Sequence, residues 1–254
     1  MKKWTALDSA KTPDGRELIL AEHDGTYSIS VGGSELMSTR KHNSEEKLAE
    51  MACAGLKTKR GVRILIGGLG LGFTLRAALK AVGPDAVVVQ AEILPEVVAW
   101  NRNPEYGLAH RELLDKRVEV AQEDVAVVIR QSPRGFDAIM LDVDNGPAAL
   151  TADGNEGLYV FSGLQAAKKA LRSGGCIVYW AAAPDHPFEK LMWQAGFEVE
   201  VHRVSAHTTS GGWHTLYLGR HGDPAKAGGT PGTSKRRPGG ASRKVSYPPQ
   251  NRPL

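Results

Sequence analysis

The sequence is poor in cysteine and contains no long hydrophobic run. Its 254 residues include two cysteines, Cys53 and Cys176, which lie too far apart to indicate a disulfide framework or a metal cluster. No stretch approaches the roughly 18 consecutive apolar residues that a membrane-spanning helix needs. Residues 1–5 are basic but lack the apolar run of a secretory signal. We therefore expect a cytoplasmic protein with no membrane partner, no metal and no prosthetic group.

The chain also lacks a strongly basic folded region, although its net charge is +4. The segment 223–254 holds seven Lys and Arg residues against the single acid Asp223, a net +6, which leaves −2 for residues 1–222. A basic charge that belongs to one tail does not indicate a specific nucleic-acid partner. This tail is rich in Gly, Pro and Ser and has few core-forming side chains, so we predict that residues 223–254 are disordered.

Short strands joined by turns are predicted for the first forty residues. Segments 17–21 and 26–31 flank His23-Asp24-Gly25, which is a hairpin signal, and Gly32-Gly33 leads into segment 35–39. We expect residues 1–41 to form a small antiparallel β unit. A helix is predicted to begin near Asn43 or Ser44, and either side chain could cap it.

From residue 62 onward, short apolar strands alternate with helical segments. Strands are expected at 62–66, 86–91, 118–121, 138–141, 176–180, 197–204 and 214–218, and helices at 74–81, 95–101, 124–131, 163–171 and 187–194. This alternation predicts an α/β fold with a mostly parallel sheet covered on both faces. The last two strands have no helix between them, so they should form an antiparallel edge hairpin. We assign residues 42–222 to a Rossmann-like, nucleoside-binding catalytic domain.

A glycine-rich turn joins the first of these strands to its helix. Gly67, Gly68, Gly70 and Gly72 would let the backbone approach a ligand closely, and the helix that follows offers free N–H groups. The pattern is not the dinucleotide fingerprint, because its final position is Phe73, and it favours a nucleoside over a pyrophosphate. The same turn could instead serve only to pack the strand against the helix.

Acidic residues follow three further strands. Glu92 lies 22 residues after Gly70, close to the spacing of about 20 at which an acid binds ribose hydroxyls. Asp124 could accept a hydrogen bond from an adenine amino group or cap the next helix, and the two roles are compatible. Asp142 and Asp144 lie where one carboxylate could bind a cationic amine and take its proton. Asx residues before Gly-Pro also form simple turns.

These features together resemble the spermidine synthases, a family of polyamine aminopropyltransferases related to the class I S-adenosylmethionine-dependent methyltransferases. The resemblance covers about residues 18–220 and rests on the glycine turn, on segments 92–98, 118–124 and 171–175, and on Leu141-Asp142 with Asn145-Gly146-Pro147. It implies that Glu92 binds ribose and that Asp124 contacts adenine. Asp142 and Asp144 then match the two aspartates of the family's D-S-x-D-P segment, with Asp144 as the catalytic base. A homodimer is also implied.

The sequence departs from this family inside the glycine turn. Spermidine synthases have G-G-G-D-G, in which the aspartate holds the amino group of the aminopropyl donor, whereas Leu69, Gly70 and Leu71 stand at this place. The resemblance favours aminopropyl transfer from decarboxylated S-adenosylmethionine to a small amine. The departure favours methyl transfer from S-adenosylmethionine to a small molecule. A non-catalytic nucleoside-binding protein that acts through a partner is a third hypothesis, and Phe73 argues against a fourth, an NAD-dependent oxidoreductase.

Overall fold

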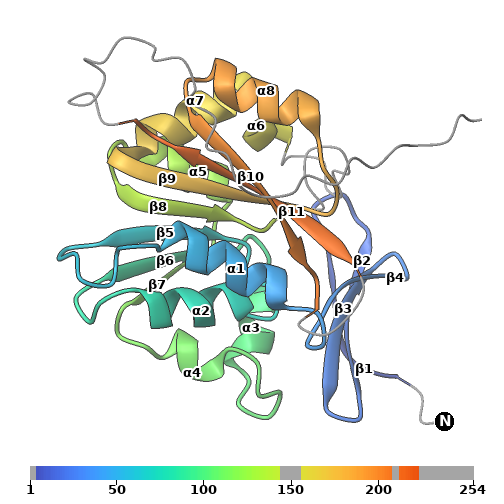
Figure 1. Ribbon diagram of the computed structural model, residues 1–254. Coiled ribbons are helices and arrows are strands. Elements are labelled where there is room, and N and C mark those ends of the chain that lie inside the picture. Colours follow the sequence, from blue (N-terminus) through green and yellow to red (C-terminus); the bar gives the residue numbers. More distant parts are fainter. Residues whose placement is uncertain (1–3, 144–155, 208–211, 223–254) are drawn as a thin grey trace, which may run out of the picture.

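The computed structural model describes residues 4–143, 156–207 and 212–222, and these residues form two sheets with helices (Figure 1). One sheet has four strands in the order β1-β2-β3-β4, and the other has seven in the order β10-β11-β9-β8-β5-β6-β7. The tail 223–254, for which we predicted disorder, lies outside the described residues. No helix within the described ranges is long and apolar enough to cross a membrane.

The N-terminal sheet is an antiparallel meander. It consists of β1 (Thr5–Lys11), β2 (Glu17–His23), β3 (Thr26–Val31) and β4 (Ser34–Ser38). Leu18 and Leu20 on β2 and Ile29 on β3 are buried, so one face of the sheet is apolar. The sequence did not predict β1, because its side chains apart from Ala10 are exposed or half-buried and it shows no apolar alternation.

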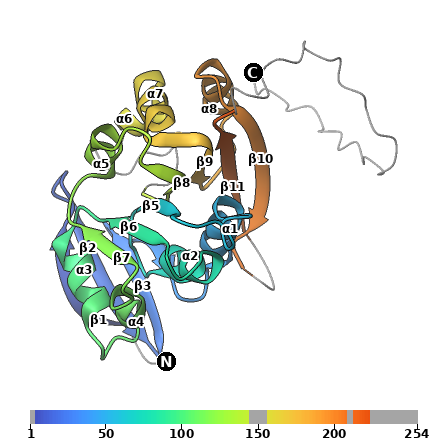
Figure 2. The same cartoon turned by 90° about the vertical axis from the view of Figure 1, so that its left-hand side faces the viewer.

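The large sheet is parallel except at one edge. Its strands are β5 (Arg63–Gly67), β6 (Val87–Ala91), β7 (Val118–Ala121), β8 (Phe136–Leu141), β9 (Leu171–Ala181), β10 (Glu198–Ser205) and β11 (Trp213–Arg220). Strands β5 to β9 run parallel, and β11 pairs antiparallel with both β9 and β10. Figure 2 shows β10 and β11 at one edge and β7 toward the other. The predicted α/β fold with its antiparallel edge hairpin is therefore confirmed.

Helices cover both faces of the large sheet (Figure 1). One face packs against α1 (Asn43–Ala52), α2 (Phe73–Ala81) and α3 (Pro95–Arg102), and the short α4 (His110–Leu113) packs nearby; the other face packs against α5 (Val125–Gln131), α6 (Glu156–Tyr159), α7 (Phe161–Ala170) and α8 (His186–Gln194). Alternation along β5 produces these two layers, because Ile64 and Ile66 enter one core cluster and Leu65 enters the other. The four-residue helices α4 and α6 were not predicted.

Helix α1 begins where predicted, but its predicted cap is wrong. His42 occupies the cap position, and no side chain bonds the first free N–H groups. The Asn43 amide instead donates to the Ser205 carbonyl at 2.8 Å, and the Ser44 hydroxyl donates to Glu45 at 2.5 Å. A tertiary partner has thus taken the Asn43 side chain and the neighbouring acid the Ser44 side chain, so neither caps the helix.

The N-terminal sheet shares a core with the large sheet. Leu18, Leu20 and Ile29 belong to the same buried cluster as Ile64, and the Trp100 indole Nε1 donates to Asp8 Oδ2 at 2.7 Å. This packing holds the small sheet close to the carboxyl ends of the parallel strands.

Candidate active site

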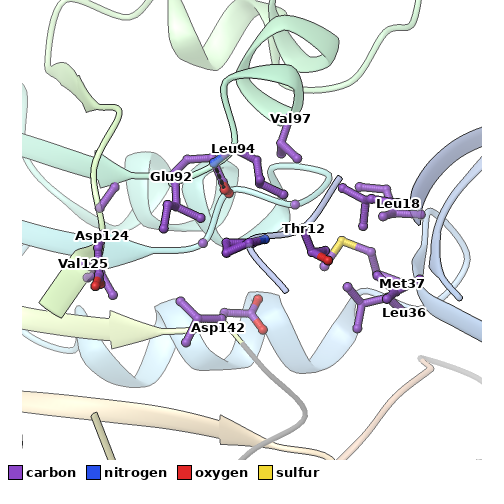
Figure 3. A pocket seen from close by; sticks show the side chains of 18 of the residues that line it. Thr12, Leu18, Leu36, Met37, Glu92, Leu94, Val97, Asp124, Val125 and Asp142 are labelled. Atoms are coloured by element: carbon purple, nitrogen blue, oxygen red, sulfur yellow. Dashed lines mark hydrogen bonds between the residues drawn. The ribbon is translucent and has the colours of Figure 1, made fainter. Parts of the chain in front are cut away.

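A pocket lies at the carboxyl ends of β5, β6, β7 and β8, and the N-terminal sheet forms its opposite wall (Figure 3). It brings together five of the residues singled out from the sequence, namely Gly68, Gly70, Glu92, Asp124 and Asp142. Gly67 ends β5 and Gly72 precedes α2, so both flank the turn without lining the pocket. Carboxyl ends of parallel strands are where open α/β sheets bind their ligands.

Packing alone explains two of the glycines in the turn. Gly68 and Gly72 have φ angles of +85° and +80°, which side chains rarely tolerate. A Cβ on Gly68 would also collide with the Asp142 carbonyl oxygen, and one on Gly72 would collide with Ala109 Cβ. The structure therefore supports the packing role of these two glycines whether or not a ligand binds.

Gly70 differs, because its neighbour comes from the N-terminal sheet. A Cβ added to Gly70 would lie 2.5 Å from Met37 Sδ and 2.7 Å from Met37 Cε. Both residues line the pocket. A thioether therefore covers the part of the turn where the resembling family has an aspartate.

Glu92 fastens the glycine turn to the end of β6. The residue is 8% exposed. Its Oε2 accepts from the Leu69 N–H and its Oε1 from the Leu94 N–H, both at 2.9 Å. Burial raises the pKa of Glu92, and the N–H groups of Leu69, Leu94 and Ile93 offset part of that rise. Each carboxylate oxygen has a second lone pair, so Glu92 can still accept from ligand hydroxyls.

Asp124 caps helix α5, as the sequence predicted. Its Oδ1 accepts from the Ala126 N–H at 2.7 Å, and the residue also lines the pocket. The cap occupies one oxygen and leaves acceptor capacity on the other. The capping role is confirmed, and contact with an adenine ring remains a prediction.

Asp142 follows β8 and faces the pocket (Figure 3). Its N–H donates to the Gly67 carbonyl at 3.0 Å, and its Oδ2 accepts from the Thr74 hydroxyl at 3.3 Å. Burial raises the pKa of Asp142, and the Thr74 hydroxyl counteracts this. Asp144, the predicted base, lies outside the described residues, so its role stays a prediction from sequence.

Glu45 does not line the pocket, but its charge interacts with that of Asp142, and the sequence did not single it out. It lies in the first turn of α1, is 8% exposed and accepts the Ser44 hydroxyl on Oε2. Burial raises the pKa of Glu45, and the charge of Asp142 raises it further. The Oγ atom of Ser44 also lies 2.9 Å from His214 Nδ1. An acid in a first helical turn normally indicates an exposed partner of the helix dipole, so only the tertiary fold reveals this burial.

Comparisons with known proteins agree with this fold. No family model and no curated protein matches the sequence. The match to the spermidine synthase from Thermotoga maritima covers 85% of this chain and 73% of the Thermotoga chain, with a TM-score of 0.67 and 20% identity. The match to a spermidine synthase in complex with the transition state analogue AdoDATO covers 85% of this chain and 74% of that enzyme's chain, with a TM-score of 0.70 and 20% identity. The match to a probable spermidine synthase from Corynebacterium glutamicum covers 87% of this chain and 81% of the Corynebacterium chain, with a TM-score of 0.59 and 15% identity.

The predicted resemblance is therefore confirmed for the fold. This chain has a spermidine synthase-like fold, in which a separate antiparallel N-terminal sheet accompanies the mostly parallel seven-stranded sheet.

Proposed function

We propose that this protein is a transferase that moves a group from a sulfonium nucleoside to an amine. One observation carries the proposal: a single pocket gathers a glycine turn, Glu92, Asp124 and Asp142 at the carboxyl ends of four neighbouring parallel strands. The spermidine synthase-like fold supports a transferase as well.

The residues of the nucleoside end have matching chemistry. Glu92 would accept hydrogen bonds from the ribose hydroxyls through the lone pairs that Leu69 and Leu94 leave free. Asp124 would accept from the adenine amino group while it caps α5. Both acids are held by backbone N–H groups, so they are oriented before a ligand arrives, which lowers the cost of binding.

At the amine end, Asp142 lines the pocket and Glu45 interacts with it electrostatically from outside the lining, and both acids have raised pKa values. A bound ammonium group would relieve both the burial of negative charge and the repulsion between the two carboxylates. The pair therefore favours a cationic amine over a neutral or anionic acceptor.

The transfer needs little chemistry from the protein beyond orientation and proton removal. The amine nitrogen attacks the carbon next to the sulfonium; a C–N bond forms, the C–S bond breaks, and sulfur leaves as a neutral thioether. The proton released from nitrogen goes to a carboxylate. We assign this proton to Asp144, on the sequence alone, and we assign to Asp142 the orientation of donor or acceptor.

Two donors fit this scheme. Aminopropyl transfer from decarboxylated S-adenosylmethionine would release methylthioadenosine and would belong to polyamine biosynthesis; the likeness to spermidine synthases favours it. Methyl transfer from S-adenosylmethionine would release S-adenosylhomocysteine. The position of Met37 over Gly70 favours this second form, because a thioether rather than an acid covers that part of the turn and does not repel the carboxylate of S-adenosylmethionine.

Calorimetric titration of the full chain with S-adenosylmethionine, its decarboxylated form and methylthioadenosine tests the nucleoside site. We expect binding of at least one sulfonium nucleoside, weakened about 10-fold or more in Glu92→Gln, because hydrogen bonds to charged groups are worth about 1.5–3 kcal/mol. Incubation of each donor with a panel of diamines, followed by mass spectrometry, then identifies the transferred group. Failure of all three nucleosides to bind the wild type would contradict the proposal.

A further inference from the structure

The charges around the pocket have an uneven distribution. Among the described residues that line it, Glu92, Glu123, Asp124 and Asp142 are acidic, and Arg16 is the one cation. A ligand that carries both a positive and a negative group would meet complementary charge in such a pocket. A ligand with positive groups alone would leave Arg16 without a partner from the ligand.

Arg16 is held in position by the turn between β1 and β2. Its carbonyl accepts from the Thr12 N–H at 2.9 Å and from the Thr12 hydroxyl at 3.0 Å. Its guanidinium Nε donates to Asp14 Oδ2 at 2.6 Å, and its side chain is 39% exposed. The contact to Asp14 uses one of five N–H donors, so the two terminal nitrogens can still bind a carboxylate with two parallel hydrogen bonds.

The N-terminal sheet and its β1–β2 turn, which contribute Arg16 to the pocket, also contribute uncharged side chains. Thr12 and Met37 lie on the same wall of the pocket, which the N-terminal sheet forms (Figure 3). Met37 covers Gly70 with a thioether, so that wall presents a cation and apolar atoms rather than an acid. The acids lie on the opposite wall, at the strand ends.

This arrangement discriminates between the two candidate donors. S-adenosylmethionine carries a carboxylate on its methionine chain, and the decarboxylated donor differs in lacking that group. The decarboxylated donor would therefore offer Arg16 no carboxylate to pair with.

We propose that Arg16 binds the carboxylate of the donor, so that the protein uses intact S-adenosylmethionine and discriminates against its decarboxylated form. This inference rests on the proposed function, because it assigns a donor to the same nucleoside site. Arg16 acts as a specificity-determining residue, and the thioether of Met37 over Gly70 adds no negative charge that would repel the carboxylate.

The test compares the wild type and Arg16→Gln in calorimetric titrations with S-adenosylmethionine, decarboxylated S-adenosylmethionine and methylthioadenosine. For the wild type we expect tighter binding of S-adenosylmethionine than of the decarboxylated form. In Arg16→Gln we expect a loss of about 10- to 100-fold for S-adenosylmethionine, the value typical of a charged hydrogen-bonded pair. Affinity for methylthioadenosine, which has neither the carboxylate nor the amine, should stay unchanged and so reports that the pocket is folded.

Two further variants sharpen the result. Arg16→Lys keeps the charge but loses the planar fork, so it should fall between the wild type and Arg16→Gln for S-adenosylmethionine. Lys11→Gln removes an exposed cation near the end of β1 and should change none of the three affinities. A wild type that prefers the decarboxylated donor would overturn the inference, as would equal weakening of all three ligands in Arg16→Gln. Failure of the wild type to bind any of them would contradict the proposed function itself.

Discussion

The thioether of Met37 lies over Gly70, at the position that a side chain on this glycine would need to occupy. Met37 belongs to β4 of the N-terminal sheet, whereas Gly70 belongs to the turn between β5 and α2. The small sheet therefore shapes the nucleoside pocket directly, and the identities of these two residues depend on each other.

Substitution of Gly70 by alanine should destabilise the protein through two separate effects. The φ angle of +49° costs about 1–2 kcal/mol for a residue with a Cβ, and the new Cβ collides with Met37. In the Gly70→Ala background, Met37→Ala would relieve the collision but not the strain of the positive φ angle. Urea unfolding of the wild type, both single variants and the double variant should thus give a favourable coupling energy of about 1 kcal/mol or more. Simple additivity of the two single changes would contradict this account.

Asp124 allows its structural and ligand-binding roles to be separated. Asp124→Ala should lose about 1 kcal/mol of stability, because the helix cap on Ala126 N–H disappears. Asp124→Asn should retain most of that stability, since asparagine caps equally well. If Asp124 also accepts from the adenine amino group, both variants should bind methylthioadenosine more weakly. Normal binding by Asp124→Asn would leave Asp124 with the capping role alone.

The sequence predicted the layers of the fold well, because the periodicity of apolar residues and the composition of each segment determine them. The strand–helix alternation after residue 62 and the antiparallel pairing of β10 with β11 follow from local patterns that tertiary contacts did not override. Strand β1 escaped prediction because its exposed side chains show no alternation, and it is held in place mainly by pairing with β2.

The site was predictable only where a residue follows a strand. Glu92, Asp124 and Asp142 share a pocket because the carboxyl ends of parallel strands meet at one edge of the sheet. Arg16 and Glu45 gave no such signal. Arg16 reaches the pocket from a turn of a different sheet, and the burial of Glu45 depends on how α1 packs. Contacts between units far apart in sequence cannot be read from spacing.

The predicted base Asp144 has a direct kinetic test. Asp144→Asn should abolish most of the turnover, by about 100-fold or more, because general base catalysis contributes about 10²–10⁴-fold. Nucleoside binding, measured by calorimetry, should remain intact, since Glu92, Asp124 and the glycine turn are unchanged. Unchanged turnover would remove the assignment of Asp144. Loss of nucleoside binding would show that Asp144 supports the pocket rather than the proton transfer.

Glu45 should make the stability of the protein depend on pH in a predictable direction. Burial, together with the charges of Asp142 and Glu46, raises its pKa above the ordinary value of 4.5, so the folded state binds this proton more tightly than the unfolded state. The stability gained from the bound proton is complete below the unfolded pKa. It is lost as the pH rises through the raised pKa of the folded protein.

Glu45→Gln cannot ionise and should escape this loss. Its free energy of unfolding relative to wild type should therefore rise between about pH 4.5 and pH 9, by at least about 1.4 kcal/mol, the equivalent of one pKa unit. Urea unfolding across this pH range measures the difference. Glu50→Gln on the same helix is the matched control, because Glu50 is exposed and pairs with Lys47, and its difference from wild type should stay nearly constant. A constant difference for Glu45→Gln would mean that burial does not disfavour the ionisation of Glu45. Glu45 and Asp142 could then not act as a pair of acids that a bound ammonium group relieves.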